Sequence, residues 1–121
     1  MLADVKRHPL VVAYIRKADE HLAAIGYTEH GERHCNLVAS IAYNVLARLD
    51  HPRREAELAA IAGYTHDLGN VVARDGHWLV GAMLMQRVLE ELGMAPEEIG
   101  VVVGAIGNHE EPAGQPVNPV S

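Results

Sequence analysis

Apolar residues recur every three or four positions along most of the chain, which is the spacing of a helix with one buried face. Proline, glycine and polar turn residues interrupt this spacing and mark where helices should begin and end. The pattern predicts five helices, over about 9–25, 31–49, 52–69, 77–92 and 96–109. Because the connections are short, successive helices should run roughly antiparallel. The sequence therefore predicts an all-α fold, a single-domain helical bundle of about five helices.

Two segments depart from the regular pattern. The triplet Val101-Val102-Val103 has strand propensity, but the preceding Pro96-Glu97-Glu98 is typical of the first turn of a helix. The last segment, 110–121, contains three prolines and no apolar periodicity. We expect it to form an extended or disordered tail, with the core of the domain over about 9–109.

Composition narrows the class of protein. Ten Lys and Arg residues against 16 Asp and Glu residues give a net charge of −6, which argues against a protein that coats DNA or an anionic membrane. The single cysteine, Cys35, excludes an internal disulfide and fits a reducing compartment. No apolar run approaches the roughly 20 residues that cross a bilayer, and the first residues lack the features of a signal peptide. We therefore expect a soluble, cytoplasmic protein.

Four of the eight histidines extend the apolar faces of predicted helices: His34, His66, His77 and His109. Two of them lie near the start of their helices and two near the end. In an antiparallel succession, the start of one helix and the end of the next lie in the same layer, so the four imidazoles should meet at one end of the bundle. Asp67 follows His66 about 100° around the helix axis and can reach the same space.

This histidine layer predicts a metal site. A single histidine on an apolar face is usually a hydrogen-bonded core residue, but four beside a carboxylate are difficult to explain in that way. Unpaired buried polar groups cost free energy, and protonated imidazoles repel one another. A divalent cation removes both costs by accepting imidazole nitrogen and carboxylate oxygen as ligands. His30 is a weaker candidate, as a residue that supports a ligand or contacts substrate, because Gly31 separates it from the helix of His34.

The motifs around these histidines carry a family resemblance. Thr65-His66-Asp67-Leu68-Gly69 closes an apolar helix, and His34 lies upstream in HGERHCNLVASIA. Asp75-Gly76-His77 followed by Gly81, and Asn108-His109-Glu110-Glu111, complete the set. Over about 27–111 the chain resembles the HD-domain metal-dependent phosphohydrolases, in the branch whose additional histidines hold a second metal. The resemblance implies an enzyme with an HD-domain-like fold that hydrolyses a phosphate ester, a nucleotide or a related small phosphate.

The resemblance also implies roles for individual residues. His34 matches the first metal ligand, His66 and Asp67 match the paired ligands, and His77 and His109 match the ligands of a second ion. His66 and Asp67 are accordingly the expected catalytic residues, with Asp67 orienting a metal-activated water that attacks phosphorus. The expected cofactor is one or two divalent ions, and the ligand types are compatible with Mn, Fe, Co, Ni, Zn or Mg.

Four further residues are candidates for substrate binding: Arg33, Asn70, Arg74 and Glu110. The two arginines lie next to predicted ligands and suit a phosphate group, although each is as readily explained as a solvated side chain. Asn70, like Asn108, lies where helix ends favour asparagine for backbone reasons. Glu110 could be a general acid, a metal ligand or a solvated residue of the tail.

One departure from the family pattern affects the expected activity. The family has a further metal-binding aspartate on a later helix, whereas this sequence contains no aspartate after Asp75. Three explanations remain open: a truncated form, substitution by Glu110 or Glu111, or completion of the site by another chain. A bundle without its final helix would expose an apolar groove, which favours a homo-oligomer. The alternative functions are a non-catalytic metal- or nucleotide-binding regulatory module and a purely structural bundle without metal.

Overall fold

The computed structural model describes residues 1–27 and 31–108, and within these ranges all of the regular secondary structure is helical. The all-α prediction is therefore confirmed, although the number of helices is larger than expected. The elements are α1 (Leu2–Arg7), α2 (Pro9–Ala24), α3 (Glu32–Arg48), α4 (Arg53–Thr65), the 3₁₀ helix η1 (Leu68–Val71), α5 (His77–Glu91) and α6 (Pro96–Gly107). None of the helices in the described part is long and apolar enough to cross a membrane.

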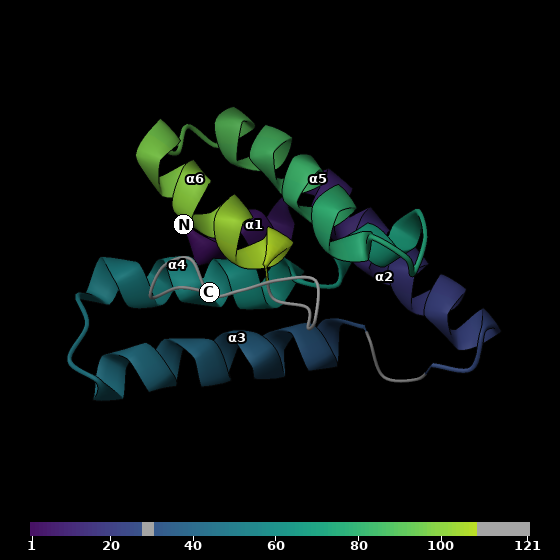
Figure 1. Ribbon diagram of the computed structural model, residues 1–121, viewed down its shortest axis with the longest axis horizontal. Coiled ribbons are helices and arrows are strands. Elements are labelled where there is room, and N and C mark those ends of the chain that lie inside the picture. The colour runs from purple at the N-terminus through teal and green to yellow at the C-terminus, as the bar shows by residue number, and fades with distance from the viewer. Residues whose placement is uncertain (28–30, 109–121) are drawn as a thin grey trace.

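The helix α4 lies at the centre of the arrangement. It packs against α3 on one side and against α6 and α1 on the other, while η1 packs between α2 and α5. Figure 1 shows α3 and α4 as an antiparallel pair, with the α5–α6 pair on the opposite side of α4. The packing is compatible with a helical bundle.

The helix boundaries follow the residues that were expected to set them. Proline occupies the first turn of α2 and of α6, at Pro9 and Pro96. The side chain of His8 accepts a hydrogen bond of 3.2 Å from the backbone N–H of Leu10, which caps the start of α2. Gly26 and Gly93 follow the ends of α2 and α5 with φ angles of 98° and 79°, which glycine adopts without steric cost.

Two boundaries differ from the prediction. The chain forms the short helix α1 before Pro9, and its Val5 is fully buried; six residues are too few for a periodic pattern to stand out. The helix predicted to reach Gly69 and Asn70 ends at Thr65, and η1 follows it. The chain leaves the helix early because the segment after Asp67 turns to pack against the backbone of α5, as described below.

Alanine is prominent in the core around α4, beside larger aliphatic side chains. The sequence contains no phenylalanine, and the central helix α4 is buried over most of its length, including Ala56, Ala59, Ala60 and Ala62. Alanine side chains let neighbouring helices approach the α4 backbone closely. Larger apolar residues of the flanking helices, such as Leu22, Met85 and Leu89, complete the packing.

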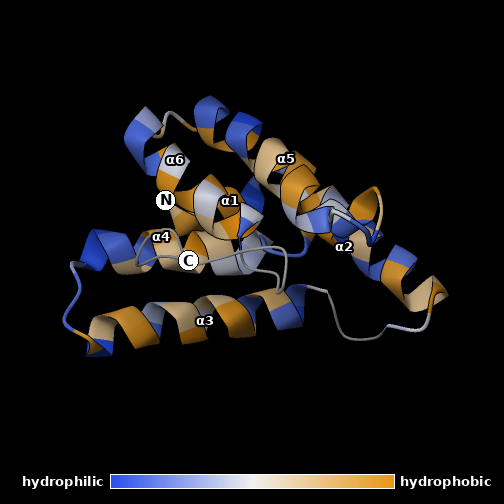
Figure 2. Cartoon of the chain, in the orientation of Figure 1, coloured by the Kyte–Doolittle hydropathy of each residue, from blue (hydrophilic) through white to orange (hydrophobic). Residues whose placement is uncertain are grey.

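The apolar stripe of the helix predicted over 31–49, which was expected to face the core, is only partly buried in α3. Four of its residues are half exposed or more, at 58%, 54%, 50% and 65% of their surface: Leu37, Ile41, Val45 and Leu49. Leu46 of the same stripe is buried as expected, and the buried face also carries Cys35 and Ala39. Because α3 packs mainly against α4, only one side of it is covered. Figure 2 shows the remaining apolar positions along α3 at the edge of the molecule.

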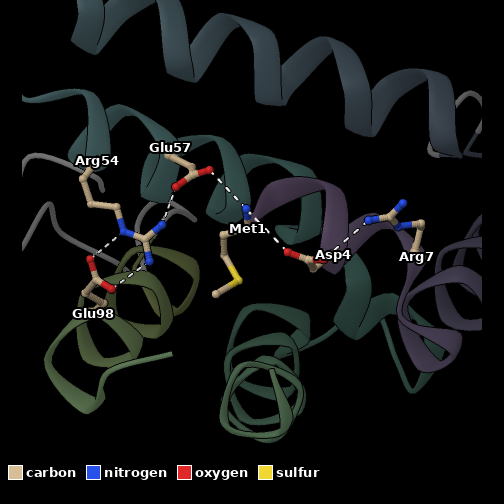
Figure 3. A network of polar contacts seen from close by, with 6 residues as sticks. All are labelled: Met1, Asp4, Arg7, Arg54, Glu57 and Glu98. Carbon is tan, nitrogen blue, oxygen red and sulfur yellow. Dashed lines mark hydrogen bonds and ion pairs between the residues drawn. The ribbon is translucent and has the colours of Figure 1, made fainter. Parts of the chain in front are cut away.

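A network of charged groups joins α4 to α6 and α1 (Figure 3). Arg54 donates from Nε and Nη2 to both carboxylate oxygens of Glu98, at 2.7 and 2.8 Å, and from Nη1 to Glu57. Glu57 also lies 3.4 Å from the amino group of Met1. The hydrogen bond from Arg54, together with its positive charge, outweighs burial and lowers the pKa of Glu98.

Replacing Arg54 with glutamine should make the protein less sensitive to acid. A carboxyl group with a lowered pKa in the folded state stabilises the protein above its ordinary pKa, and this contribution is lost as the pH falls through the folded-state value. At about pH 6, Arg54→Gln should therefore reduce the free energy of unfolding by roughly 0.5–1 kcal/mol, which is typical of a partly exposed ion pair. As the pH falls through the lowered pKa of Glu98, the difference should shrink, because protonation removes the negative charge that Arg54 stabilises.

Urea unfolding monitored by circular dichroism measures this effect. Lys17→Gln is the control, because the exposed side chain of Lys17 pairs with Glu20 within α2, and this pair does not join α2 to a second element. A difference between wild type and Arg54→Gln that persists unchanged at low pH would show that the arginine acts through packing rather than charge.

Candidate metal centre

Four polar side chains meet where three helix ends come together. His34 lies in the first turn of α3, and His77 is the first residue of α5. His66 and Asp67 directly follow α4, before η1 begins. Because α3 and α5 begin at the level where α4 ends, the antiparallel packing brings these residues into one layer.

The carboxylate of Asp67 is the centre of the cluster. Its Oδ2 atom lies 3.1 Å from Nε2 of His66 and 3.6 Å from Nε2 of His34. Its Oδ1 atom lies 3.4 Å from Nε2 of His77. Three imidazoles thus present the same ring nitrogen to one carboxylate. One ligand atom from each of His34, His66 and Asp67 lies within 4.8 Å of the others, a spacing that one metal ion could bridge.

Backbone carbonyl groups fix the orientation of two of these rings. Nδ1 of His66 lies 2.6 Å from the carbonyl oxygen of Gly63, and Nδ1 of His77 lies 3.0 Å from that of Arg74. A carbonyl oxygen only accepts hydrogen bonds, so each Nδ1 must carry the proton and donate. In the neutral ring, Nε2 then holds a lone pair directed at Asp67. Lone pairs and a carboxylate repel unless a positive charge lies among them, and metal-binding histidines commonly have this Nδ1–H to carbonyl bond. The donor set therefore fits a divalent cation.

The cluster becomes progressively more buried from His34 to His77. The side chains of His34 and His66 are 28% and 18% exposed, whereas those of Asp67 and His77 are 9% and 0% exposed. Solvent and small molecules therefore approach the carboxylate from the side of His34. The inner side of the cluster, at His77, is closed by protein.

Cys35 is next to His34 in sequence but belongs to the hydrophobic core and not to the group of converging ligand atoms. Burial, followed by the negative charges of Asp67 and Asp19, raises the pKa of its thiol to about 12. At neutral pH this residue is a protonated thiol that contributes to the core.

A close backbone contact holds the Asp67 turn against α5. A Cβ atom at Gly69 would overlap the carbonyl oxygen of His77 and lie 2.7 Å from the backbone nitrogen of Gly81. Only a residue without a side chain fits between these segments. The sequence contained a sign of this contact, because Gly81 lies within the apolar stripe of its helix and a glycine there indicates a close backbone approach.

The predicted substrate-binding residues that the structure describes differ in their exposure and in their contacts. Arg33 is exposed on α3, beside His34. The guanidinium carbon of Arg74 lies 4.9 Å from the ring centre of Tyr27. Nη1 of Arg74 donates to Oδ1 of Asn70 at 3.4 Å. Asn70 is only 2% exposed, and its Nδ2 donates to the carbonyl oxygen of Asp67 at 2.9 Å.

Other candidates play backbone roles or lie outside the described residues. Asn108 donates to the carbonyl oxygen of Gly104 at 2.9 Å, so its side chain caps the end of α6. The remaining predicted site residues lie outside the described ranges: His30, His109, Glu110 and Glu111.

No protein-family model, curated protein or solved structure matches this chain. The chemistry of the cluster is therefore the basis for a functional proposal.

Proposed function

We propose that this chain is a metal-dependent phosphohydrolase with an HD-domain-like fold, acting on a small phosphate ester such as a nucleotide. The observation that supports the proposal most directly is the convergence of three Nε2 atoms on the carboxylate of Asp67. Two of these nitrogens are kept free of hydrogen in the neutral ring by the Nδ1–H bonds to Gly63 and Arg74. A divalent cation would accept these nitrogen and carboxylate oxygen atoms as ligands.

His34, His66 and Asp67 would hold a divalent ion, with His77 on the other carboxylate oxygen. A divalent ion bound there supplies Lewis-acid chemistry, which acidifies a coordinated water and offsets the charge on a phosphoryl group. Asp67 would orient the attacking water through a hydrogen bond. The carbonyl groups of Gly63 and Arg74 would keep the imidazoles aligned throughout the reaction.

A non-catalytic metal-binding module is the second candidate, and two observations favour it. Asn70 is buried and directed at the backbone of Asp67, and the guanidinium of Arg74 already lies between Tyr27 and Asn70. Two of the groups expected to hold substrate are thus engaged within the fold. In this alternative, the cluster binds metal and regulates a partner without turnover.

Protein purified without a histidine tag or chelator should contain about one or two equivalents of a transition metal per chain. Inductively coupled plasma mass spectrometry measures this content, before and after incubation with Mn²⁺, Fe²⁺, Co²⁺, Ni²⁺ or Zn²⁺. His66→Gln should lower the content, whereas His21→Gln should not, because His21 is exposed and bonds to the carbonyl of Val71.

Activity assays on the loaded protein distinguish the two candidates. Hydrolysis of p-nitrophenyl phosphate, its bis-ester or nucleoside phosphates that depends on Asp67 would support the enzyme. Metal binding without turnover on such a panel would support the regulatory module. A metal content near zero after all five incubations would contradict both.

A further inference from the structure

We propose that Asn70 is a positioning residue that fixes Asp67 and His77 relative to each other, rather than a contact for substrate. The inference rests on the proposed metal site, whose ligands it concerns. It assigns to Asn70 a role within the protein that differs from the one its sequence position suggested.

Asn70 binds the residue that carries the central carboxylate. Its Nδ2 donates to the carbonyl oxygen of Asp67 at 2.9 Å, and its backbone N–H donates to the same oxygen at 3.0 Å. Two hydrogen bonds from one residue to one carbonyl group restrict the rotation of the Asp67 peptide. They therefore limit where the Asp67 carboxylate can point.

Arg74 continues this connection to the buried histidine. Oδ1 of Asn70 accepts from Nη1 of Arg74 at 3.4 Å. The carbonyl oxygen of Arg74 accepts from Nδ1 of His77 at 3.0 Å and from the backbone N–H of His77 at 3.3 Å. Asp67 is thus held through its own carbonyl group and His77 through the carbonyl group of Arg74, and each of these carbonyl groups accepts two hydrogen bonds.

The contacts form a closed circuit. It runs from Asp67 to Asn70, then to Arg74 and His77, and returns to Asp67 through the 3.4 Å approach of Nε2 to Oδ1. Asn70 is the member of the circuit whose side chain both donates and accepts. Because it is 2% exposed, its amide is available to the circuit and not to a molecule in solution.

The chemistry of the side chain makes the inference testable. Asn70→Asp keeps the shape and the acceptor for Arg74 but places an oxygen against the carbonyl oxygen of Asp67. Groups that orient metal ligands typically contribute 10–100-fold to metal affinity. We therefore expect Asn70→Asp to raise the dissociation constant for Co²⁺ by about 10–100-fold and to change the visible absorption spectrum of the bound ion. That spectrum reports ligand geometry directly.

Asn36 provides a matched control. Its Nδ2 donates to the carbonyl oxygen of Glu32 at 3.1 Å, and its Oδ1 accepts from Nζ of Lys6 at 2.7 Å. It makes the same kinds of bond as Asn70 but joins α1 to α3 instead of two proposed ligands. Asn36→Asp should leave both the Co²⁺ affinity and the spectrum unchanged.

A second variant keeps the test informative if Asn70→Asp does not fold. Arg74→Gln removes the guanidinium that Asn70 accepts from, yet retains the backbone carbonyl used by His77. If Asn70 positions Asp67 and His77 through Arg74, this variant should bind Co²⁺ more weakly and show an altered spectrum. If these residues only contact substrate, neither the affinity nor the spectrum should change. Circular dichroism at 222 nm establishes whether each variant is folded.

The outcomes separate this inference from the proposed function. Wild type that binds Co²⁺, together with weakened binding in folded Asn70→Asp or in Arg74→Gln, supports the circuit. Wild type that binds Co²⁺ as tightly as both folded variants, with identical spectra, overturns the positioning role and leaves the metal site standing. Wild type that binds no Co²⁺ overturns the proposed function and this inference with it.

Discussion

Replacing Asp67 with asparagine should abolish tight metal binding while leaving the helices in place. The Asp67 carboxylate is the group that all three imidazoles approach, and asparagine removes its charge and one of its two oxygens. We expect metal affinity to fall by at least about 100-fold, since the substitution removes a ligand as well as the negative charge that attracts the cation. Isothermal titration calorimetry with Mn²⁺ or Zn²⁺ measures the change.

Thermal unfolding gives a second measure of the same effect. A ligand present at about 100 times its dissociation constant stabilises the folded state by roughly 2.7 kcal/mol. Wild type should gain this stabilisation from added metal, and Asp67→Asn should gain almost none. Asp75→Asn is the control, because Asp75 is exposed in the turn before α5. Equal stabilisation of Asp67→Asn and wild type by metal would place the ion at another site.

Replacing Gly69 with alanine should destabilise the whole protein and disturb the cluster. The added Cβ would overlap the carbonyl oxygen of His77 and crowd Gly81, and both obstacles are backbone atoms that a change of rotamer cannot remove. Overpacking of this kind costs about 3 kcal/mol or more when the backbone itself must move. Chemical denaturation should show the loss, and the metal affinity should fall as well because Asp67 and His77 would move apart.

Gly100→Ala is the matched control for this substitution. Gly100 also lies in a helix, but a Cβ atom there would meet nothing within 4 Å. An alanine in a helix interior is favoured over glycine by up to about 1 kcal/mol, so this variant should be slightly more stable than wild type. Equal stabilities for Gly69→Ala and wild type would mean that η1 and α5 do not need their close contact.

Much of the fold could be predicted because the chain marks its helix ends clearly. Pro9, Pro96, Gly26 and Gly93 act locally, so their effect does not depend on the rest of the protein. The orientation of α3 could not be predicted in the same way. An apolar stripe such as Leu37, Ile41 and Val45 shows which side of a helix avoids water, but not how many neighbours are present to cover it.

The candidate site was also only partly predictable from the sequence. His34, His66, Asp67 and His77 could be placed together from sequence because helix ends in antiparallel packing share a layer. The hydrogen bonds to the carbonyl groups of Gly63 and Arg74 could not, since they depend on ring orientation. The direction of the Asn70 amide was equally inaccessible, because it follows from the early end of α4 and the tight turn of η1.

The one-sided packing of α3 has a consequence for the rates at which a metal ion would bind and dissociate. A helix held mainly by one neighbour, with much of its apolar surface in water, can separate at less cost than global unfolding. His34 is carried by this helix, whereas Asp67 and His77 are buried on the other elements. Each local opening of α3 would remove one ligand and leave the others in position. The rate of metal exchange would then be set by the local opening of α3, and the protein could bind or release metal without global unfolding.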